Sequence, residues 1–495
     1  MSRISRRSLL TSGAAAGVLA ASGLALSAAP KPGGTLRAVL PGGSLQDSWD
    51  ARTHSGLFMM AAAHGAVFDC LTEIGPDGAL RGELAEGWEA SPDARVWTFD
   101  LRKGVTFHNG KPFVADDVLE TFSMHSRESG SAVWPLLASV SEIRKITPHQ
   151  VQFELDAPNA DFPYLLSDYH LVIYPAGYVE LAMIGGIGTG MYRVEDFAPG
   201  EAFRASRVNG HYKDGKAGFF DDLEFLSESS EKGMRLLRDD ATDTVAQISP
   251  IQAAQLADWR SGSLQRINGN AHVSLAVTTA GPEGSHLRRA LQHGVDRRAL
   301  LDDVLLSHGD IGRDTPVGPA NQYFDAKLDP PAFDPDLARY HFKKSGLDRL
   351  EIMIDEKLPS SAGQIGKAVV AQMNELGLRS GVGEGAARVD SSSGRAIEDW
   401  TLSTYLTAGA PWNASKWSHP NFETMLLSAR SELDTAKRRS RYEDLQQLLR
   451  DEGAITVPVF ADHLAATSER IAMPTTIGRH WAMDNARFAE RWWRA

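Results

Sequence analysis

The sequence of 495 residues contains a single cysteine, Cys70, so the chain has no second thiol with which to form an internal disulfide. No cysteine follows the apolar N-terminal run either, where a lipid-modified residue would have to stand. The sequence therefore predicts a chain without disulfide or lipid anchor, in which Cys70 is a buried and unreactive thiol.

Signatures of catalysis and of nucleotide binding are also missing. No segment matches Gly-x-x-x-x-Gly-Lys-Ser/Thr, Gly-x-Ser-x-Gly or His-Glu-x-x-His. Gly188-Thr189-Gly190 is followed by Arg193, where a dinucleotide-binding loop would need its third glycine. The 15 histidines include no His-x-x-x-His pair, and His419, His463 and His480 are isolated. We therefore predict no catalytic residues, no metal ligands and no cofactor.

Basic residues are fewer than acidic residues in this sequence. The chain has 63 acidic against 51 basic residues and a formal net charge of -12. A surface of that sign repels nucleic acids and anionic lipids. The sequence therefore predicts no nucleic-acid partner and no binding to membrane surfaces.

The N-terminus has the composition of an export signal. Arg6 and Arg7 precede a Gly- and Ala-rich apolar run over 13–29 without acidic residues, which is typical of a twin-arginine signal peptide. The run is short and only mildly apolar, so a permanent transmembrane helix is the weaker alternative. We expect a signal over residues 1–29, cleaved near Ala28 to Pro30, and a mature protein that is soluble in the periplasm. Loss of three arginines would bring its net charge to about -15.

Linkers rich in proline or serine and internal repeats are not found. A chain of 495 residues exceeds what one hydrophobic core usually supports, so two or more lobes are expected. Short apolar strands alternate with longer helical segments, which predicts an α/β fold. Without a flexible linker, strands should cross between the lobes, and the apolar runs Val273–Val277 and Ile455–Phe460 are the candidates.

Two helices of the C-terminal half have clear start signals. Asp334 and Pro335 supply an N-cap and a first helical residue, and Gly346 predicts the end of that helix. Ser285 is expected to open an earlier helix, on which Leu287 and Leu291 recur at helical spacing.

The most informative passage runs from Leu84 to Phe122. Trp97, Phe99 and Leu101 alternate with polar residues, which predicts a half-buried strand. A tight turn at His108–Pro112 and a helix beginning at Ala115 follow it.

The amino-acid sequence of this passage, taken as a whole, resembles that of the extracellular solute-binding proteins of family 5, which serve peptide and nickel transport. Further segments match in the same order, namely Gly33–Leu36, Gly188–Tyr192, Leu287–Leu291, Val295–Arg297 and Phe333–Ala338. The resemblance covers nearly all of the chain from residue 31 onward.

The resemblance implies a two-lobed type II periplasmic binding protein fold with an additional subdomain. The first lobe would comprise 31–271 plus the returning 456–495, with the subdomain at about 76–187, and the second lobe would comprise 272–455. The implied function is the substrate-binding component of an ABC transporter, which captures a small polar solute, a peptide or peptide-like molecule. It would act as a monomer and deliver the solute to a permease whose ATPase subunits are separate chains.

A cleft that closes on a solute needs groups from both lobes. In the first lobe, Gly43 would let the backbone approach the ligand, and Ser44 and Gln46 would hydrogen-bond to it. In the second lobe, aromatic walls and hydrogen-bonding groups are expected between residues 400 and 413. The predicted ligand-binding residues there are Trp400, Thr404, Tyr405, Trp412 and Asn413. A plain turn after the first strand, and packing of the aromatic residues in a core, are the alternatives.

Two features qualify the implied ligand. Thr404 stands where peptide-binding members of the family carry an aspartate that pairs with the amino terminus of the ligand, which leaves other amine or amide ligands open. Glu398 and Asp399 could neutralise a cationic ligand, but adjacent carboxylates are more often solvated surface. An exported enzyme, and a binding protein coupled to a sensor, remain alternative functions.

Overall fold

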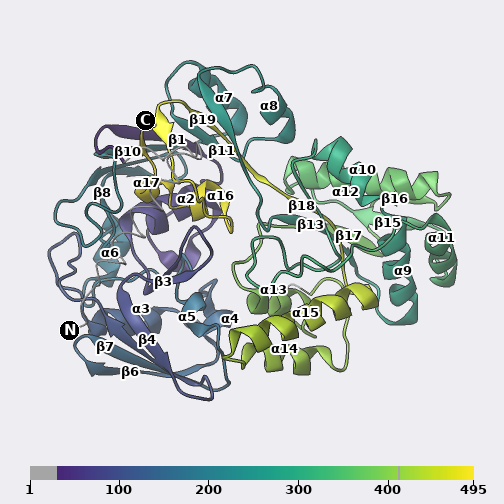
Figure 1. Ribbon diagram of the computed structural model, residues 1–495, viewed down its shortest axis with the longest axis horizontal. Coiled ribbons are helices and arrows are strands. Elements are labelled where there is room, and N and C mark those ends of the chain that lie inside the picture. Colours follow the sequence, from purple (N-terminus) through teal and green to yellow (C-terminus); the bar gives the residue numbers. More distant parts are fainter. Residues whose placement is uncertain (1–29, 411–412) are drawn as a thin grey trace, which may run out of the picture.

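The computed structural model describes residues 30–410 and 413–495 and has two lobes (Figure 1). The predicted signal peptide over residues 1–29 and Trp412 lie outside the described residues, which begin at Pro30, the last residue of the predicted cleavage region. In the part of the chain that is described, no helix is both long enough and apolar enough to cross a membrane.

The first lobe is built on a seven-stranded mixed sheet of order β12-β19-β11-β1-β10-β9-β8. Helix α7 (Ser230–Arg238) and helix α8 (Pro250–Ala254) cover one face, where Met234 and Leu237 share a buried cluster with Val39. Helix α2 (Gly56–Ala62) packs on the other face. The strands are β1 (Thr35–Leu40), β8 (Tyr192–Ala198), β9 (Ala202–Arg207), β10 (Asp222–Ser227), β11 (Thr244–Ala246), β12 (Gly262–Ile267) and β19 (His463–Ser468).

A four-stranded antiparallel sheet of order β4-β5-β7-β6 lies inside the span 76–187 that was predicted as a subdomain. The predicted half-buried strand is confirmed as β5 (Val96–Leu101), in which Trp97, Phe99 and Leu101 are buried. Gly110 takes the positive φ of 86° that the predicted turn requires. The other elements here are β4 (Ala85–Ala90), β6 (Val140–Thr147), β7 (Gln150–Leu155), α3 (Ala115–Met124), α4 (Trp134–Leu137) and α5 (Phe162–Leu165).

The second lobe is built on a six-stranded sheet of order β14-β18-β13-β17-β15-β16. Its core lies between this sheet and the helices α9 (Gly281–Gly294) and α12 (Ser360–Glu375). Helix α11 (Pro335–Lys344) packs along α9. The strands are β13 (His272–Val277), β14 (Gly309–Ile311), β15 (Leu350–Met353), β16 (Ser380–Val382), β17 (Ala387–Ser392) and β18 (Thr456–Ala461).

One helix start was predicted correctly and one was not. The Asp334 carboxylate accepts a hydrogen bond from the Leu337 N–H, so the N-cap of α11 is confirmed. Helix α9 begins at Gly281 and not at Ser285, because Pro282 already occupies the first turn, where a proline costs no hydrogen bond.

Helices α13 (Glu398–Leu406), α14 (Phe422–Arg430) and α15 (Thr435–Glu452) form a further layer of the second lobe, which faces α5 of the first lobe (Figure 1). Leu402, Phe422 and Leu445 belong to the buried cluster that holds the layer together. The remaining elements are β2 (Thr72–Ile74), β3 (Leu80–Gly82), α6 (Val179–Gly185), α10 (Arg297–Ala299), β20 (Ile471–Ala472), α16 (Ala482–Asn485), α17 (Phe488–Arg491) and β21 (Trp493–Arg494).

The chain crosses between the sheets at the ends of the two predicted apolar runs and not within them. Strands β13 and β18 pair with each other inside the second sheet, and β18 also pairs with β14. The chain leaves the first sheet after Ile267 and rejoins it at His463. The segment 456–461 therefore belongs to the second sheet, and the predicted returning part of the first lobe begins at β19, because backbone pairing decides which sheet an apolar strand joins.

Candidate ligand-binding cleft between the lobes

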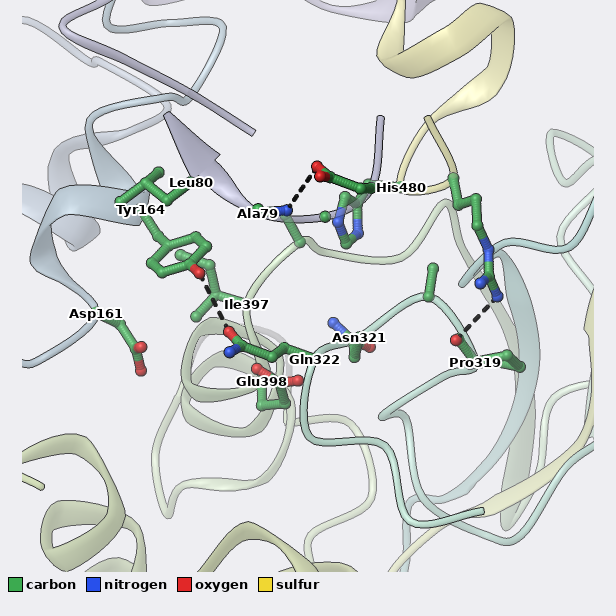
Figure 2. A pocket seen from close by; sticks show the side chains of 15 residues that line it. Ala79, Leu80, Asp161, Tyr164, Pro319, Asn321, Gln322, Ile397, Glu398 and His480 are labelled. Atoms are coloured by element: carbon green, nitrogen blue, oxygen red, sulfur yellow. Dashed lines mark hydrogen bonds between the residues drawn. The ribbon is translucent and has the colours of Figure 1, made fainter. Parts of the chain in front are cut away.

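A cavity of about 600 Å³ lies between the two lobes (Figure 2). The first lobe contributes the turn between β2 and β3, the start of α5 and the segment before α16, and the second lobe contributes the loop before α11 and the start of α13. The lining residues are Asp77, Gly78, Ala79, Leu80, Asp161, Tyr164, Pro319, Ala320, Asn321, Gln322, Ala396, Ile397, Glu398, Arg479 and His480.

Two carboxyl groups line one side of this cavity. Glu398, at the start of α13, is 2% exposed and accepts a hydrogen bond from the Tyr323 N–H at 2.6 Å. Burial raises the pKa of Glu398 to about 7 and the pKa of Asp161 to about 6. Asp161 is paired with Arg438 at 2.7 Å, whereas Glu398 has no ion-pair partner within the described ranges.

A guanidinium group lies on another side of the cavity (Figure 2). Arg479 donates from Nε to the Asn268 carbonyl at 2.9 Å and from Nη2 to the Pro319 carbonyl at 3.0 Å. Among residues 30–410 and 413–495, no carboxylate forms an ion pair with it. Burial lowers the pKa of neighbouring His480 to about 4, so that ring is neutral at pH 7.

The lobes touch directly beside the cavity. The Tyr164 hydroxyl donates to Gln322 Oε1 at 3.2 Å, and the Ala160 N–H donates to the Arg430 carbonyl at 2.8 Å. Tyr442 also donates to Asp161 Oδ2 at 3.2 Å. These contacts join the two walls of the cavity, so its shape depends on how the lobes are closed.

The residues predicted in the first lobe lie together in one turn after β1. The Gly43 N–H donates to Ser227 Oγ at 3.0 Å, and Ser44 Oγ donates to Gln46 Oε1 at 2.5 Å. None of the three lines the cavity in this structure. Their contact with a ligand stays a prediction.

The ligand-binding residues predicted in the second lobe mostly pack against or hydrogen-bond to other residues of the protein. Trp400 packs in the buried cluster of the four-stranded sheet, with the Arg395 guanidinium 4.5 Å from its ring centre. Thr404 Oγ1 donates to the Trp400 carbonyl at 2.7 Å, and the Tyr405 hydroxyl donates to Ser392 Oγ at 3.2 Å. Asn413 Nδ2 donates to two backbone carbonyls, those of residues 407 and 417. Their role in ligand binding also stays a prediction.

The structure corrects the interpretation of Glu398 and Asp399 as solvated surface. Both are buried, because α13 begins with its first turn against the opposite lobe. Asp399 accepts from Arg430 Nε at 2.8 Å and does not line the cavity, so of these two carboxyl groups only Glu398 faces it. From the sequence, this pair was a candidate to neutralise a cationic ligand, but no local pattern of residues indicated that it is buried.

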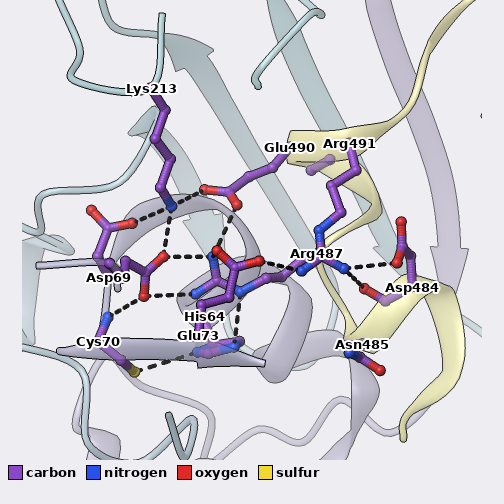
Figure 3. Close-up of polar contacts among 12 residues, drawn as sticks. His64, Asp69, Cys70, Glu73, Lys213, Asp484, Asn485, Arg487, Glu490 and Arg491 are labelled. Atoms are coloured by element: carbon purple, nitrogen blue, oxygen red, sulfur yellow. Dashed lines mark hydrogen bonds and ion pairs between the residues drawn. The ribbon is translucent and has the colours of Figure 1, made fainter. Parts of the chain in front are cut away.

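A second polar cluster lies inside the first lobe (Figure 3). Asp69, Glu83 and Glu490 bring carboxylate oxygens within 4.8 Å of one another, a spacing that could hold a metal ion. The Lys213 ammonium already contacts all three, at 2.8, 2.6 and 3.0 Å respectively. Because a cation of the chain itself occupies the centre, the cluster is a structural ion network.

Two lobes built on separate sheets, with a polar cavity between them, are the architecture of a type II periplasmic binding protein. The family model of bacterial extracellular solute-binding proteins, family 5 Middle, matches residues 79–431. The chain therefore belongs to this family, whose members bind solutes outside the cytoplasm.

Individual relatives are similar over most of the chain. The dipeptide-binding protein of Escherichia coli K12 is 24% identical over 434 residues, which cover 77% of this chain and 80% of that protein. The solved structure of AgaA from A. tumefaciens R10 in complex with agropinic acid has a TM-score of 0.79 at 19% identity and covers 93% of this chain and 99% of its own. The Helicobacter pylori protein DppA in complex with the peptide STSA has a TM-score of 0.78 at 17% identity, covering 93% and 98%.

Proposed function

We propose that this solute-binding protein captures a small dipolar solute, a short peptide or a peptide-like molecule, for an ABC transporter. The observation that carries the proposal is a pair of ionisable groups in the cavity, the Glu398 carboxyl and the Arg479 guanidinium, neither of which has an ion-pair partner among the residues that the structure describes. A ligand with an ammonium group near Glu398 and a carboxylate near Arg479 would pair with the buried carboxyl group and with the exposed guanidinium group.

The cavity has a suitable size for such a ligand. Its volume of about 600 Å³ falls within the range of roughly 300 to 1,000 Å³ typical of small-molecule sites. The dipeptide-binding relative and the peptide complex named above support a peptide, whereas the agropinic acid complex shows that the same fold accepts other solutes.

In this proposal, Glu398 pairs with the ligand's amino group, as an aspartate at position 404 would do in the peptide-binding members of the family. Thr404 carries no charge, and its hydroxyl is already bonded to the Trp400 carbonyl. Glu398 lies six residues earlier on the same helix and lines the cavity. We therefore assign the ligand's amine to Glu398, with Asp161 beside it.

The proposal also covers the transport system in which this protein would act. The named relatives are binding proteins, so we propose binding without turnover, by a monomer that hands the solute to a permease driven by separate ATPase subunits. Export by the twin-arginine signal over residues 1–29 and release into the periplasm belong to the same proposal.

Calorimetry with blocked peptides tests the site. A free dipeptide, its N-acetyl form and its C-terminal amide are titrated into wild type, Glu398→Gln and Arg479→Met, with Arg441→Met as a control for loss of a cation outside the cavity. Acetylation should weaken binding to wild type but not to Glu398→Gln, and amidation should weaken binding to wild type but not to Arg479→Met. Equal losses in all four proteins would contradict the assignment. Identification of a released solute without either charge, by native mass spectrometry, would contradict the ligand class.

A further inference from the structure

Four consecutive residues shortly before helix α17 have a left-handed backbone conformation, and none of them is a glycine. Their φ angles are 57°, 58°, 58° and 61°, and they are Met483, Asp484, Asn485 and Ala486. Residues with a Cβ atom adopt this conformation at a cost in free energy, so a run of four must be held by its surroundings. Strain of this kind is concentrated at functional sites. The left-handed turn 483–486 closely follows the segment 478–481, whose Arg479 and His480 line the cavity between the lobes.

Packing and an ion pair hold the left-handed turn in place. The carbonyl oxygen of Ala486 lies against Gly65, where a Cβ atom would come within 2.1 Å of it. Arg491 points toward Asp484 (Figure 3) and donates from Nη1 to the Asp484 carbonyl at 2.9 Å and to its Oδ1 at 2.7 Å. All four residues of the turn are buried. The turn is therefore a fixed part of the first lobe.

The side-chain amide of Asn485 binds the backbone beside the cavity. Its Oδ1 accepts hydrogen bonds from the His480 N–H at 2.9 Å and from the Trp481 N–H at 3.3 Å. Its Nδ2 donates to the Ile74 carbonyl at 3.4 Å, at the end of β2. Residues 77–80, which follow β2, also line the cavity. One amide thus joins two of the segments with which the first lobe lines the cavity.

The segment 478–481 is also bound on the other side of Arg479. Asp484 Oδ1 accepts a hydrogen bond from the Gly478 N–H at 2.6 Å. Gly478 packs closely on the Asn485 amide, since a Cβ atom at this glycine would come within 2.6 Å of Asn485 Cγ. The backbone on both sides of Arg479 is therefore attached to the left-handed turn.

The Arg479 side chain extends from this backbone to the second lobe. Its guanidinium group donates to the Asn268 carbonyl at 2.9 Å, between the two sheets, and to the Pro319 carbonyl at 3.0 Å, in the second lobe. Arg479 is exposed, so burial does not restrict its side chain. A fixed backbone limits the positions that the guanidinium group can take, which lowers the entropy cost of binding a carboxylate.

We propose that Asn485 is a positioning residue for the solute's carboxylate and acts through the backbone that carries Arg479. The inference rests on the proposed function, in which Arg479 pairs with that carboxylate. Asparagine suits this position for two reasons. It adopts the left-handed conformation more readily than most residues with a Cβ atom, and its amide both accepts and donates hydrogen bonds.

Calorimetry of four proteins tests the role of Asn485. Wild type, Asn485→Gly, Arg479→Met and the double variant are titrated with the dipeptide Ala-Ala, its N-acetyl form and its C-terminal amide. Glycine adopts a left-handed φ without strain, so Asn485→Gly removes the amide while the turn can keep its conformation. We expect this variant to bind Ala-Ala about three- to tenfold more weakly than wild type. Amidation should weaken its binding less than that of wild type, whereas acetylation should weaken both equally. In the double variant, Asn485→Gly should cause no further loss beyond that of Arg479→Met.

Hydrogen exchange followed by mass spectrometry gives a readout that needs no ligand. The N–H groups of His480 and Trp481 should exchange faster in Asn485→Gly than in wild type. They should stay protected in Asn485→Asp, which keeps the accepting oxygens. Ser307→Gly is the matched control and should behave as wild type, because Ser307 also has a left-handed φ, 62°, but is exposed and does not line the cavity. Circular dichroism and thermal unfolding establish that each variant is folded.

The outcomes separate this inference from the proposed function. If wild type shows the amidation loss and Asn485→Gly shows the same loss, or exchanges as slowly as wild type, the role of Asn485 is overturned and the proposed function stands. An equal loss of affinity for all three probes in Asn485→Gly would show that Asn485 only supports the fold. Absence of an amidation loss in wild type would contradict the assignment of the carboxylate to Arg479, and this inference with it.

Discussion

Arg438 on α15 donates to Asp161 at the start of α5 at 2.7 Å, which joins the two lobes through a pair of buried side chains. The pKa of Asp161 is nevertheless raised to about 6, because the cost of burial outweighs the attraction of Arg438. The pair exists only while the lobes touch, so it favours the closed arrangement that encloses the cavity.

Removing one member of this pair should weaken closure. We expect Arg438→Met to lower ligand affinity by about tenfold or more, because an uncompensated buried carboxylate costs several kcal/mol in the closed form. Small-angle scattering with ligand should show less compaction than wild type. Arg441→Met is the control on the same helix, because Arg441 pairs with Glu432 within the second lobe. Wild-type affinity and compaction in Arg438→Met would show that the pair does not contribute to closure.

Glu398 should make the protein less stable as the pH rises. Its folded-state pKa is about 7 against an ordinary 4.5, so the folded state keeps a proton that the unfolded state loses across this window. Its contribution to the free energy of unfolding should therefore fall by about 3 kcal/mol between pH 4.5 and pH 7.5. Urea unfolding at several pH values gives the free energy of unfolding of ligand-free wild type and of Glu398→Gln. The difference between these two free energies measures the contribution of Glu398. A difference that stays constant with pH would show that Glu398 is not neutral in the folded state.

Lys213 should be essential to the stability of the first lobe. Lys213→Met leaves Asp69, Glu83 and Glu490 without their shared cation, and we expect a loss of about 3 to 5 kcal/mol in the free energy of unfolding. Lys216→Met, at an exposed position three residues later, should change it by less than about 0.5 kcal/mol. Equal stability of the two variants by urea unfolding would contradict the role of Lys213.

Cys70 should be unreactive in the folded protein. It is 0% exposed, and burial together with the charge of Glu83 raises the pKa of its thiol. A thiol reagent such as dithionitrobenzoate should label wild type only after addition of denaturant, whereas Ser393→Cys, at an exposed position, should add one rapidly reacting thiol. Rapid labelling of native wild type would show that Cys70 is accessible. Its burial was predicted from the sequence, and the structure confirms it.

Local signals in the sequence were enough for many elements. The alternation of Trp97, Phe99 and Leu101 gave the buried face of β5, and Asp334 gave the start of α11. These features depend on neighbours a few residues away, which is why capping and periodicity reveal them. Ser285 was misjudged because Pro282 competes as a start signal within the same few residues.

The sequence by itself determined the family, the α/β class and the division into lobes, because composition, length and ordered motifs carry that information. Only the tertiary structure decided the site. Glu398 becomes a buried carboxyl group because α13 meets the opposite lobe, and Arg479 faces the same cavity from a segment 81 residues later. Asn485 reaches the Ile74 carbonyl across 411 residues. Such encounters follow from long-range packing, which no spacing in the linear chain encodes.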